Sequence, residues 1–453
     1  MQADDTIAAV ASAPGAAGVA VLRISGPQAG AIARHLLGRV PRPRHAHYIA
    51  LHEADGSLLD HGLLLWFPAP HSYTGEDVLE LQVHGSPVLL QLLLRRLHAL
   101  GARLARSGEF SQRAFLNGKL DLAQAEAVAD VIAAGSEAAL RAAQRSLAGA
   151  FSAQVQELQK RLTAVRVQIE AALDFPDEEL ELLGDPPLRS DLEALLQALA
   201  QLLAQTRRGV RLAHGLDVVL VGRPNSGKSS LLNALAGREQ AIVSALPGTT
   251  RDVLRSELAL DDVRVQLADT AGLRDSGDAI EREGVRRARA ELATADLALL
   301  VTCAADWRED LAWLQMQATP LPPLLRVLNK IDLDGTPSGP CADEGETPCI
   351  ALSARTGAGL DALRAALRER AGGDAAEAGG AFSARERHVQ ALLRTQQELL
   401  AAQAEVVASG RGGLAELAAE ALRRAQSALD ELTGVHSSED LLGSIFGSFC
   451  IGK

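Results

Sequence analysis

Apolar residues fall into two different patterns along the chain. Within the first 118 residues they form short runs rich in Val, Leu and Ile, which is typical of strands, and one longer Leu-rich run, which is typical of a helix. Strands are predicted at 6–10, 18–25, 63–67 and 78–85, and a helix at 87–100. Residues 1–118 are therefore expected to form a mixed α/β domain.

From about residue 120 the apolar residues recur at steps of three, four or seven, the spacing of one face of an α-helix. This stripe predicts one long helix that carries Leu140, Leu147, Phe151, Val155, Leu158, Leu162, Val165, Ile169 and Leu173. Pro176 is expected to end it, because proline lacks a backbone N–H and clashes with the preceding turn. The carboxylates of 174–179 could bind a metal, although a solvated helix end is the simpler interpretation. A second helix is predicted at 188–210.

Helical patterning stops near residue 213 and resumes at 383–433, after a linker of small residues at 371–380. An α/β segment lies between the two helical regions. Since the two ends of a domain often lie close together, this order predicts one helical bundle interrupted by an inserted domain. The predicted domains are 1–118, a helical domain in two parts (119–213 and 376–453), and an inserted domain at 214–375.

The inserted domain opens with a predicted strand at 216–221, and Gly222–Ser229 then fits the phosphate loop G-x-x-x-x-G-K-[ST]. Glycines let such a loop turn several backbone N–H groups toward one phosphate, and the helix N-terminus adds unpaired donors. Lys228 is expected to reach the outer phosphates and Ser229 to ligate Mg²⁺. A chance Gly-rich turn is the alternative, and the strand–loop–helix context disfavours it.

Two further motifs follow predicted strands at 263–267 and 324–328. Asp269-Thr-Ala-Gly272 is expected to hold Mg²⁺ through water and to approach the γ-phosphate. In Asn329-Lys330-Ile-Asp332, the Asp332 carboxylate can accept two hydrogen bonds from the N1–H and the amine of guanine, a pair that adenine does not offer. Ser353-Ala354-Arg355 is expected to close over the base. GTP is therefore the predicted nucleotide.

The predicted GTP site combines these motifs with 244–252, which lies between the phosphate loop and Asp269, at the position of the first switch of GTPases. Thr250 is expected to complete the magnesium shell. The residue after Gly272 is Leu273, where signalling GTPases place the Gln that orients the attacking water. Water must therefore be activated in another way, or hydrolysis must be very slow. The full predicted set is Asn225, Ser226, Gly227, Lys228, Ser229, Ser230, Ser244, Ala245, Leu246, Pro247, Gly248, Thr249, Thr250, Asp269, Thr270, Ala271, Gly272, Asn329, Lys330, Asp332, Ser353, Ala354 and Arg355.

Composition narrows the class of protein. The net charge of −12 argues against a protein that coats nucleic acid non-specifically. The four cysteines form no C-x-x-C pair, so neither a zinc site nor a disulfide framework is indicated. No signal peptide and no apolar run of about 18 residues is present, which predicts a cytoplasmic protein without a membrane span.

The chain resembles the MnmE (TrmE) family of bacterial tRNA-modification GTPases from end to end. The stretches that carry the resemblance are Thr6-Ile-Ala-Ala-Val10, 18–26, Ser72-Tyr-Thr-Gly-Glu-Asp77, Gly108-Glu-Phe-Ser111, Arg113-Ala-Phe-Leu-Asn117, 119–126, Asp174-Phe-Pro-Asp-Glu-Glu179, Gly248-Thr-Thr-Arg-Asp252 and Phe449-Cys-Ile-Gly-Lys453. The last stretch is the most distinctive, because few other GTPases end in this way.

The resemblance implies a multidomain α/β plus all-α fold. It comprises an N-terminal α+β domain for folate binding and dimerisation, a central helical bundle and an inserted Ras-like P-loop G domain. It also implies a homodimer that works with the FAD- and NADH-using partner MnmG on tRNA. Together they are expected to add a carboxymethylaminomethyl or aminomethyl group at C5 of the wobble uridine (position 34), using a one-carbon tetrahydrofolate donor. The G domains are expected to pair in a K⁺-dependent way.

The family's functional residues carry over by position. K⁺ would be held by Asn225, Ser244, Leu246 and Thr249, and the folate by Arg23, Glu80, Lys119 and Lys453. Glu281 is the implied catalytic residue for hydrolysis, although Glu283 and Glu291 look equally plausible from the residues alone. Cys450 is either a nucleophile near the folate-bound carbon or a packing residue of the C-terminal tail. Ala16 stands where the family's loop has arginine, so a contact of that arginine is in doubt.

A second hypothesis is a regulatory RNA-binding GTPase of ribosome assembly, related through the G domain alone. Such proteins usually append a KH module or a basic tail. This chain is acidic and has no G-x-x-G clamp in a suitable context. The N-terminal domain and the Cys450–Lys453 ending favour the tRNA-modifying enzyme.

Overall fold

The protein is described from a computed structural model that covers residues 5–174, 186–223, 225–236, 255–260, 263–269, 292–293, 295–303, 306–317, 321–341, 347–371, 381–408, 415–434 and 439–452. The chain divides into two compact units. The first comprises Met1–Ala129, Leu147–Gln197 and Ala391–Lys453, and the second comprises Asp130–Ser146 and Ala198–Gln390.

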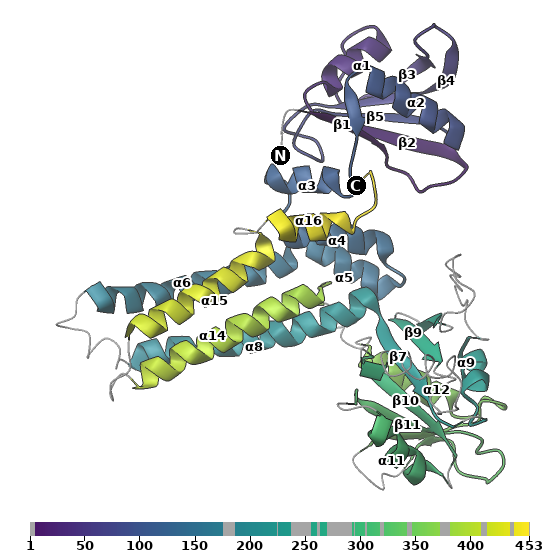
Figure 1. The fold of residues 1–453 in the computed structure, drawn as a ribbon, viewed down its shortest axis with the longest axis vertical. Coiled ribbons are helices and arrows are strands. Elements are labelled where there is room, and N and C mark those ends of the chain that lie inside the picture. Colours follow the sequence, from purple (N-terminus) through teal and green to yellow (C-terminus); the bar gives the residue numbers. More distant parts are fainter. Residues whose placement is uncertain are drawn as a thin grey trace. The chain divides into compact units, whose positions relative to one another are not determined.

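The first unit begins with a six-stranded sheet of order β3-β4-β5-β2-β1-β6 (Figure 1). Its strands are β1 (Thr6–Val10), β2 (Ala17–Ser25), β3 (His47–His52), β4 (Leu58–Phe67), β5 (Val78–Gly85) and β6 (Ala102–Leu104). Helices α1 (Ala29–Leu37) and α2 (Pro87–Ala99) pack on one face, against Leu22, Ile24 and Leu81 among others. Because strand side chains alternate, Arg23 and Glu80 belong to the opposite face.

That opposite face carries a smaller apolar cluster. Ile7 and Ala9 of β1 contact Ala105, Phe110 and Tyr73. Phe110 belongs to the short helix α3 (Glu109–Leu116). The polar pair of β2 and β5 therefore lies on a face that α3 and the loop around Tyr73 partly cover.

The strands predicted at 6–10 and 78–85 are confirmed to the residue. The run at 63–67 proves to be the end of the longer β4. β3 and β6 were not among the predicted strands. β3 has only three consecutive apolar residues, Ile49–Leu51, between polar ends, and β6 has only three residues in all.

The helical region follows. Its helices are α4 (Leu122–Ala133), α5 (Glu137–Leu147), α6 (Ala150–Asp174), α8 (Pro186–His214), α14 (Glu386–Ala408), α15 (Ala415–Thr433) and α16 (Glu439–Gly447). The prediction of one continuous helix through Leu140–Leu173 is wrong. Gly149 has φ of 89°, a left-handed conformation that ends α5 and starts α6. α6 is described as far as Asp174, and Pro176, where the helix is expected to end, lies outside the described residues.

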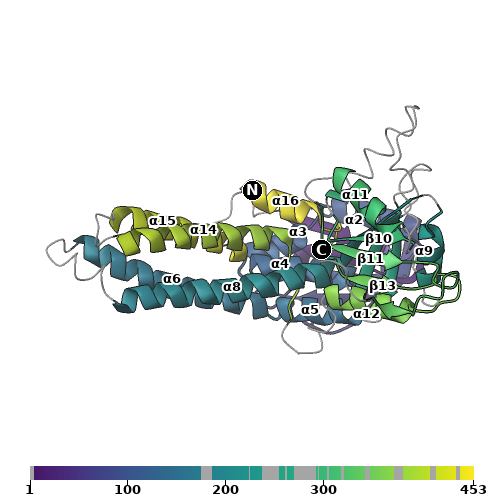
Figure 2. The same cartoon turned by 90° about the horizontal axis from the view of Figure 1, so that it is seen from below.

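Helices from before and after the inserted domain pack together within the first unit. Figure 2 shows α6 and α15 side by side. The Gln159 amide of α6 donates to Asp430 of α15 at 2.8 Å. The interrupted helical bundle is therefore confirmed.

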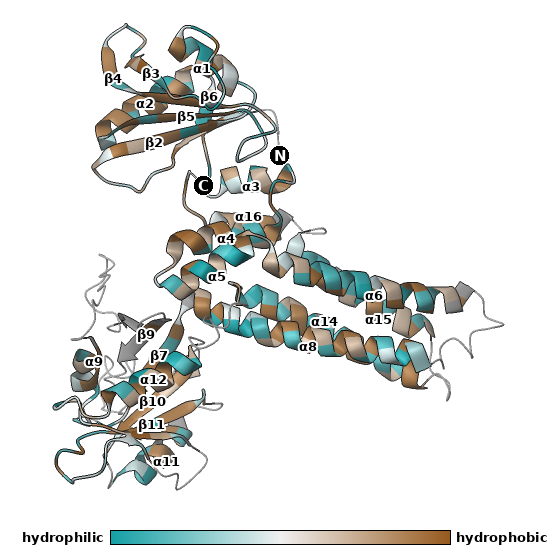
Figure 3. Cartoon of the chain, turned by 180° about the vertical axis from the view of Figure 1, so that it is seen from behind, coloured by the Kyte–Doolittle hydropathy of each residue, from teal (hydrophilic) through white to brown (hydrophobic). Residues whose placement is uncertain are grey.

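The second unit contains a seven-stranded sheet of order β12-β13-β11-β10-β7-β9-β8. Its strands are β7 (Leu216–Val221), β8 (Arg255–Leu260), β9 (Val263–Asp269), β10 (Leu297–Thr302), β11 (Leu324–Leu328), β12 (Gly339–Pro340) and β13 (Cys349–Ala351). Its helices include α9 (Lys228–Ala236), α11 (Trp307–Gln317) and α12 (Leu360–Arg370). The central strand β10 is buried throughout and strongly hydrophobic (Figure 3).

The five strands from β13 to β9 are parallel, and β8 and β12 are antiparallel to their neighbours. The carboxyl ends of parallel strands meet at one edge, where α/β sheets bind ligands. The predicted strands at 216–221 and 324–328 are confirmed, and the one at 263–267 extends to Asp269. No helix among the described residues is long and apolar enough to span a membrane.

Candidate guanine-nucleotide and folate sites

The phosphate loop joins β7 to α9, as predicted. Gly222 has φ of 151°, and a Cβ there would lie 2.2 Å from the carbonyl oxygen of Val301, so only glycine fits. The Lys228 ammonium donates to the carbonyl oxygens of Gly222 at 2.8 Å and Arg223 at 3.1 Å. Two carbonyl groups of the loop thus hold the Lys228 ammonium inside the loop, where the phosphates would bind.

Asn329 connects the predicted base-recognition motif to the phosphate loop. Its amide donates to the Ser226 carbonyl at 3.0 Å, and its side-chain oxygen accepts from the N–H groups of Lys330 at 2.8 Å and Ala354 at 3.0 Å. Lys330 also reaches the Asn225 carbonyl at 2.6 Å. One side chain therefore orients three motifs that lie far apart in the sequence.

The orientation of the Asp332 carboxylate is fixed by Ser353. The Ser353 hydroxyl donates to Asp332 Oδ1 at 2.7 Å and accepts from the Thr356 N–H at 3.2 Å. This fixes the plane of the carboxylate at the edge where β11 and β13 end. Arg355 is exposed beside it. The arrangement fits a planar base with two neighbouring N–H donors.

The backbone places two of the predicted magnesium-binding residues at the same edge of the sheet. Ser229 is exposed in the first turn of α9, and Asp269 is the last residue of β9, in register with Leu220 of β7. A hydroxyl and a carboxylate are the oxygen ligands that Mg²⁺ prefers. Several predicted residues lie outside the described part of the chain: Ser244, Ala245, Leu246, Pro247, Gly248, Thr249, Thr250, Thr270, Ala271, Gly272, Glu281 and Lys453.

Arg23 and Glu80 face each other across β2 and β5. Arg23 Nε donates to Glu80 Oε1 at 2.9 Å, and the two side chains are 22 % and 20 % exposed. The Arg23 guanidinium carbon also lies 5.3 Å from the centre of the Tyr73 ring and 5.9 Å from that of Phe110. The predicted pair is therefore brought together on a partly covered, aromatic surface.

The other folate candidates are placed differently. Lys119 is exposed, and its ammonium donates to the Pro70 carbonyl at 3.1 Å, on the loop that carries Tyr73. Exposed Cys450 lies in the C-terminal tail, where its carbonyl accepts from the Gly108 N–H at 3.4 Å. Gly452 packs so closely on β1 that a Cβ would lie 2.2 Å from the Val10 carbonyl oxygen. The tail thus reaches the strand beside β2.

Comparison with known proteins shows which family combines these two kinds of site in one chain. Residues 6–119 match the family described as GTP-binding protein TrmE N-terminus, and residues 122–450 match the MnmE helical domain. The chain belongs to the MnmE (TrmE) family. It is 50 % identical over 461 residues to the tRNA modification GTPase MnmE of Marinobacter nauticus, covering 100 % of this chain and 99 % of that one. It is 52 % identical to the protein of the same name from Methylococcus capsulatus, covering 99 % of each.

As a member of the MnmE family, the chain is a GTP hydrolase. Among solved structures, the G domain of the FeoB iron transporter of T. maritima matches 34 % of this chain and 98 % of its own, at 26 % identity and a TM-score of 0.28.

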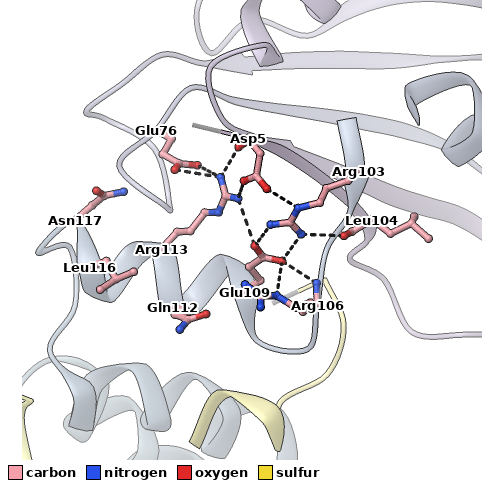
Figure 4. Close-up of a pocket in the computed structure, with 10 residues that line it drawn as sticks. All are labelled: Asp5, Glu76, Arg103, Leu104, Arg106, Glu109, Gln112, Arg113, Leu116 and Asn117. Carbon is pink, nitrogen blue, oxygen red and sulfur yellow. Dashed lines mark hydrogen bonds and ion pairs between the residues drawn. The ribbon is translucent and has the colours of Figure 1, made fainter. Parts of the chain in front are cut away.

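The N-terminal domain contains an ion-pair network that the sequence did not predict (Figure 4). Buried Arg113 pairs with Asp5 at 2.6 Å, Glu76 at 3.0 Å and Glu109 at 3.3 Å. Arg103 pairs with the same Asp5 and Glu109. The network borders a cavity of about 530 Å³. Two of the family-like stretches, 108–111 and 113–117, supply its helix, but nothing local points to Asp5 or Glu76 as partners.

The network holds Glu109 in its charged form. Burial acts to raise the pKa of Glu109, but the Arg103 hydrogen bond, the Arg106 N–H and the nearby charges outweigh it and lower that pKa from 4.5 to about 2. A carboxylate with a lowered pKa stabilises the fold above its unfolded pKa, and this contribution is lost as the pH falls through the folded pKa. The affected window runs from about pH 4.5 down to about pH 2.

Glu109→Gln is therefore expected to lower the free energy of unfolding at neutral pH, by about 1.5–3 kcal/mol for a lost charged hydrogen bond. The difference from wild type should shrink as the pH falls through this window. Trp66 fluorescence during urea unfolding reports on this domain if Trp307 and Trp313 are replaced by Phe. Glu157→Gln, which breaks an exposed pair with Arg161, is the control. A deficit that is the same at every pH would rule out this role for the Glu109 charge.

Proposed function

We propose that this protein is the GTPase subunit of an enzyme that modifies C5 of the wobble uridine in certain tRNAs. The observation that carries the proposal is the match of both family domains, over 6–119 and 122–450, combined with one G domain inserted between the helices. A ribosome-assembly GTPase related through the G domain alone would not share the N-terminal domain. The protein is proposed to act as a homodimer with the FAD- and NADH-using partner MnmG.

The nucleotide site is proposed to bind GTP with Mg²⁺. Lys228 and the backbone N–H groups of the loop would bind the phosphates. Ser229 would ligate Mg²⁺, and Asp269 would hold it through water. Asp332 would select guanine. Magnesium, when bound, supplies positive charge against the phosphate oxygens. The protein's own part is to hold the phosphates, the base and the water-activating group in fixed positions.

Hydrolysis is proposed to depend on K⁺ and on Glu281. Leu273 cannot hydrogen-bond a water molecule, so positive charge and a carboxylate from elsewhere are needed. The support is the presence of Asn225, Ser244, Leu246, Thr249 and Glu281 at the family's positions. GTP turnover should be much faster in KCl than in NaCl at equal ionic strength, and equal rates would refute the K⁺ role.

The N-terminal domain is proposed to bind a one-carbon tetrahydrofolate. A pteridine has a guanidine-like edge, which a carboxylate such as Glu80 can grip with two hydrogen bonds, and its glutamate tail suits Arg or Lys. Arg23 supplies positive charge beside Glu80, and the Tyr73 and Phe110 rings offer an apolar wall. The family's positions further propose Lys119 and Lys453 as folate-binding residues and Cys450 as a catalytic residue.

Glu80→Gln is expected to weaken binding of 5-formyltetrahydrofolate at least about tenfold, because a charged hydrogen bond contributes about 1.5–3 kcal/mol. Isothermal titration of the full-length protein measures the affinity. His84→Ala is the control, since exposed His84 lies four residues along the same strand and pairs with Asp60 instead. Equal affinity for Glu80→Gln and wild type would contradict the assignment of Glu80.

A further inference from the structure

The side chain of Arg223, which directly follows the first glycine of the phosphate loop, extends to α11. It pairs with two neighbouring carboxylates there, Glu309 at 2.9 Å and Asp310. These carboxylates differ sharply in their surroundings. The Glu309 side chain is 78 % exposed, whereas that of Asp310 is 3 % exposed. An exposed ion pair is worth little, but a buried charge that loses its partner is costly. Of the two carboxylates, Asp310 is therefore the one that fixes the position of the Arg223 side chain.

Asp310 is itself fixed from the sheet. The Thr302 hydroxyl at the end of β10 donates to Asp310 Oδ2 at 2.6 Å. The Thr302 carbonyl in turn accepts from the Asn329 N–H at 2.8 Å. The path from Asn329 through Thr302 and Asp310 to Arg223 thus links the base-recognition motif to the phosphate loop, in addition to the direct Asn329–Ser226 contact.

The backbone of Arg223 is part of the phosphate loop's own hydrogen-bonding. Its carbonyl accepts from the Lys228 ammonium at 3.1 Å and from the Ser226 N–H at 3.2 Å. A displacement of Arg223 therefore moves one of the two carbonyl groups that accept from Lys228. The position of this lysine depends on where the Arg223 side chain is anchored.

We propose that Asp310 is a positioning residue for nucleotide binding, acting through Arg223 on the phosphate loop and Lys228. Asp310 does not touch the nucleotide. It fixes the loop before GTP arrives, so less ordering remains to be done on binding. The inference rests on the nucleotide site proposed above and adds a residue from α11 that no motif contains.

Asp310→Asn tests the proposal because it keeps the size of the side chain and an oxygen for Thr302, while removing the charge that holds Arg223. Release of a fluorescent N-methylanthraniloyl-GDP from the full-length protein should be about tenfold faster, the effect of losing roughly one charged contact. Glu309→Gln, which alters the exposed partner of the same arginine, should change the rate less than about twofold.

A double-mutant comparison separates positioning from a general loss of stability. In an Arg223→Gln background, Asp310→Asn should have no further effect on nucleotide release, because its route to the loop is already cut. An undiminished effect in that background, or equal rates for Asp310→Asn and wild type, would overturn the proposal. If Asp310→Asn does not fold, Arg223→Gln alone should still release nucleotide about tenfold faster, and a wild-type rate would overturn it. Failure of wild type to bind the nucleotide would instead refute the site itself.

Discussion

Asp332→Asn is expected to lower the affinity for GTP about 100-fold and to raise the affinity for xanthosine triphosphate, because a site that hydrogen-bonds its substrate discriminates strongly between matched and unmatched donors. The carboxylate can accept both N–H groups of guanine. An asparagine amide would point an N–H group at the guanine amine, and the two donors repel. Xanthine carries a carbonyl oxygen in that place, which the amide can satisfy. Competition of both nucleotides against the fluorescent GDP measures the change.

The substitution preserves the local geometry, which makes this result specific. The Ser353 hydroxyl donates to Asp332 at 2.7 Å, and the asparagine oxygen can still accept this bond. Ser353→Ala is the control variant. It removes the Ser353–Asp332 hydrogen bond but keeps the carboxylate, so it should weaken binding of both nucleotides without exchanging their order of affinity. If Asp332→Asn weakened both nucleotides equally, Asp332 would not read the base.

Gly227→Ala is expected to lower GTP affinity by about two orders of magnitude, because it disrupts three hydrogen bonds worth about 1 kcal/mol each. A Cβ at this position would lie 2.2 Å from the Asn329 side-chain nitrogen, and Gly227 has φ of 98°. Asn329 would have to move, and its contacts with Ser226, Lys330 and Ala354 would break together. Titration with the fluorescent GDP gives the affinity, and thermal unfolding gives the stability.

Gly335→Ala is the control, because it isolates backbone strain. Gly335 has φ of 74°, but nothing lies within 4 Å of a Cβ there. The strain of about 1–2 kcal/mol should lower the unfolding temperature while leaving GTP affinity near that of wild type. If both alanine variants lost nucleotide to the same extent, strain rather than the Asn329 contact would be the cause.

The sequence predicts the G domain well because its signals are local. The strand–loop–helix around Gly222–Ser229 and the strand before Asn329 each lie within about 20 residues, and their apolar runs are distinct. Periodicity fails at Gly149, where the apolar stripe continues through a left-handed residue that breaks the helix. It fails again in β3, where only three apolar residues, Ile49–Leu51, stand in a row between polar ends.

The contacts within the sites depend on tertiary structure instead. Arg23 and Glu80 stand out as polar residues in apolar strands, but only the antiparallel register makes them partners. Arg113 and Asp5 are 108 residues apart, and Arg223 and Glu309 are 86 apart. No periodicity spans such distances, so chemistry-bearing residues can be named from sequence while their partners cannot.

The most direct test of the proposed function is the wobble nucleoside itself. Mass spectrometry of nucleosides from a strain lacking this protein should show wobble uridine without its C5 aminomethyl-type group. The wild-type protein should restore the modification, whereas Asp332→Asn, with its impaired GTP site, should not. Unchanged wobble uridine modification in the strain that lacks the protein would contradict the proposed function.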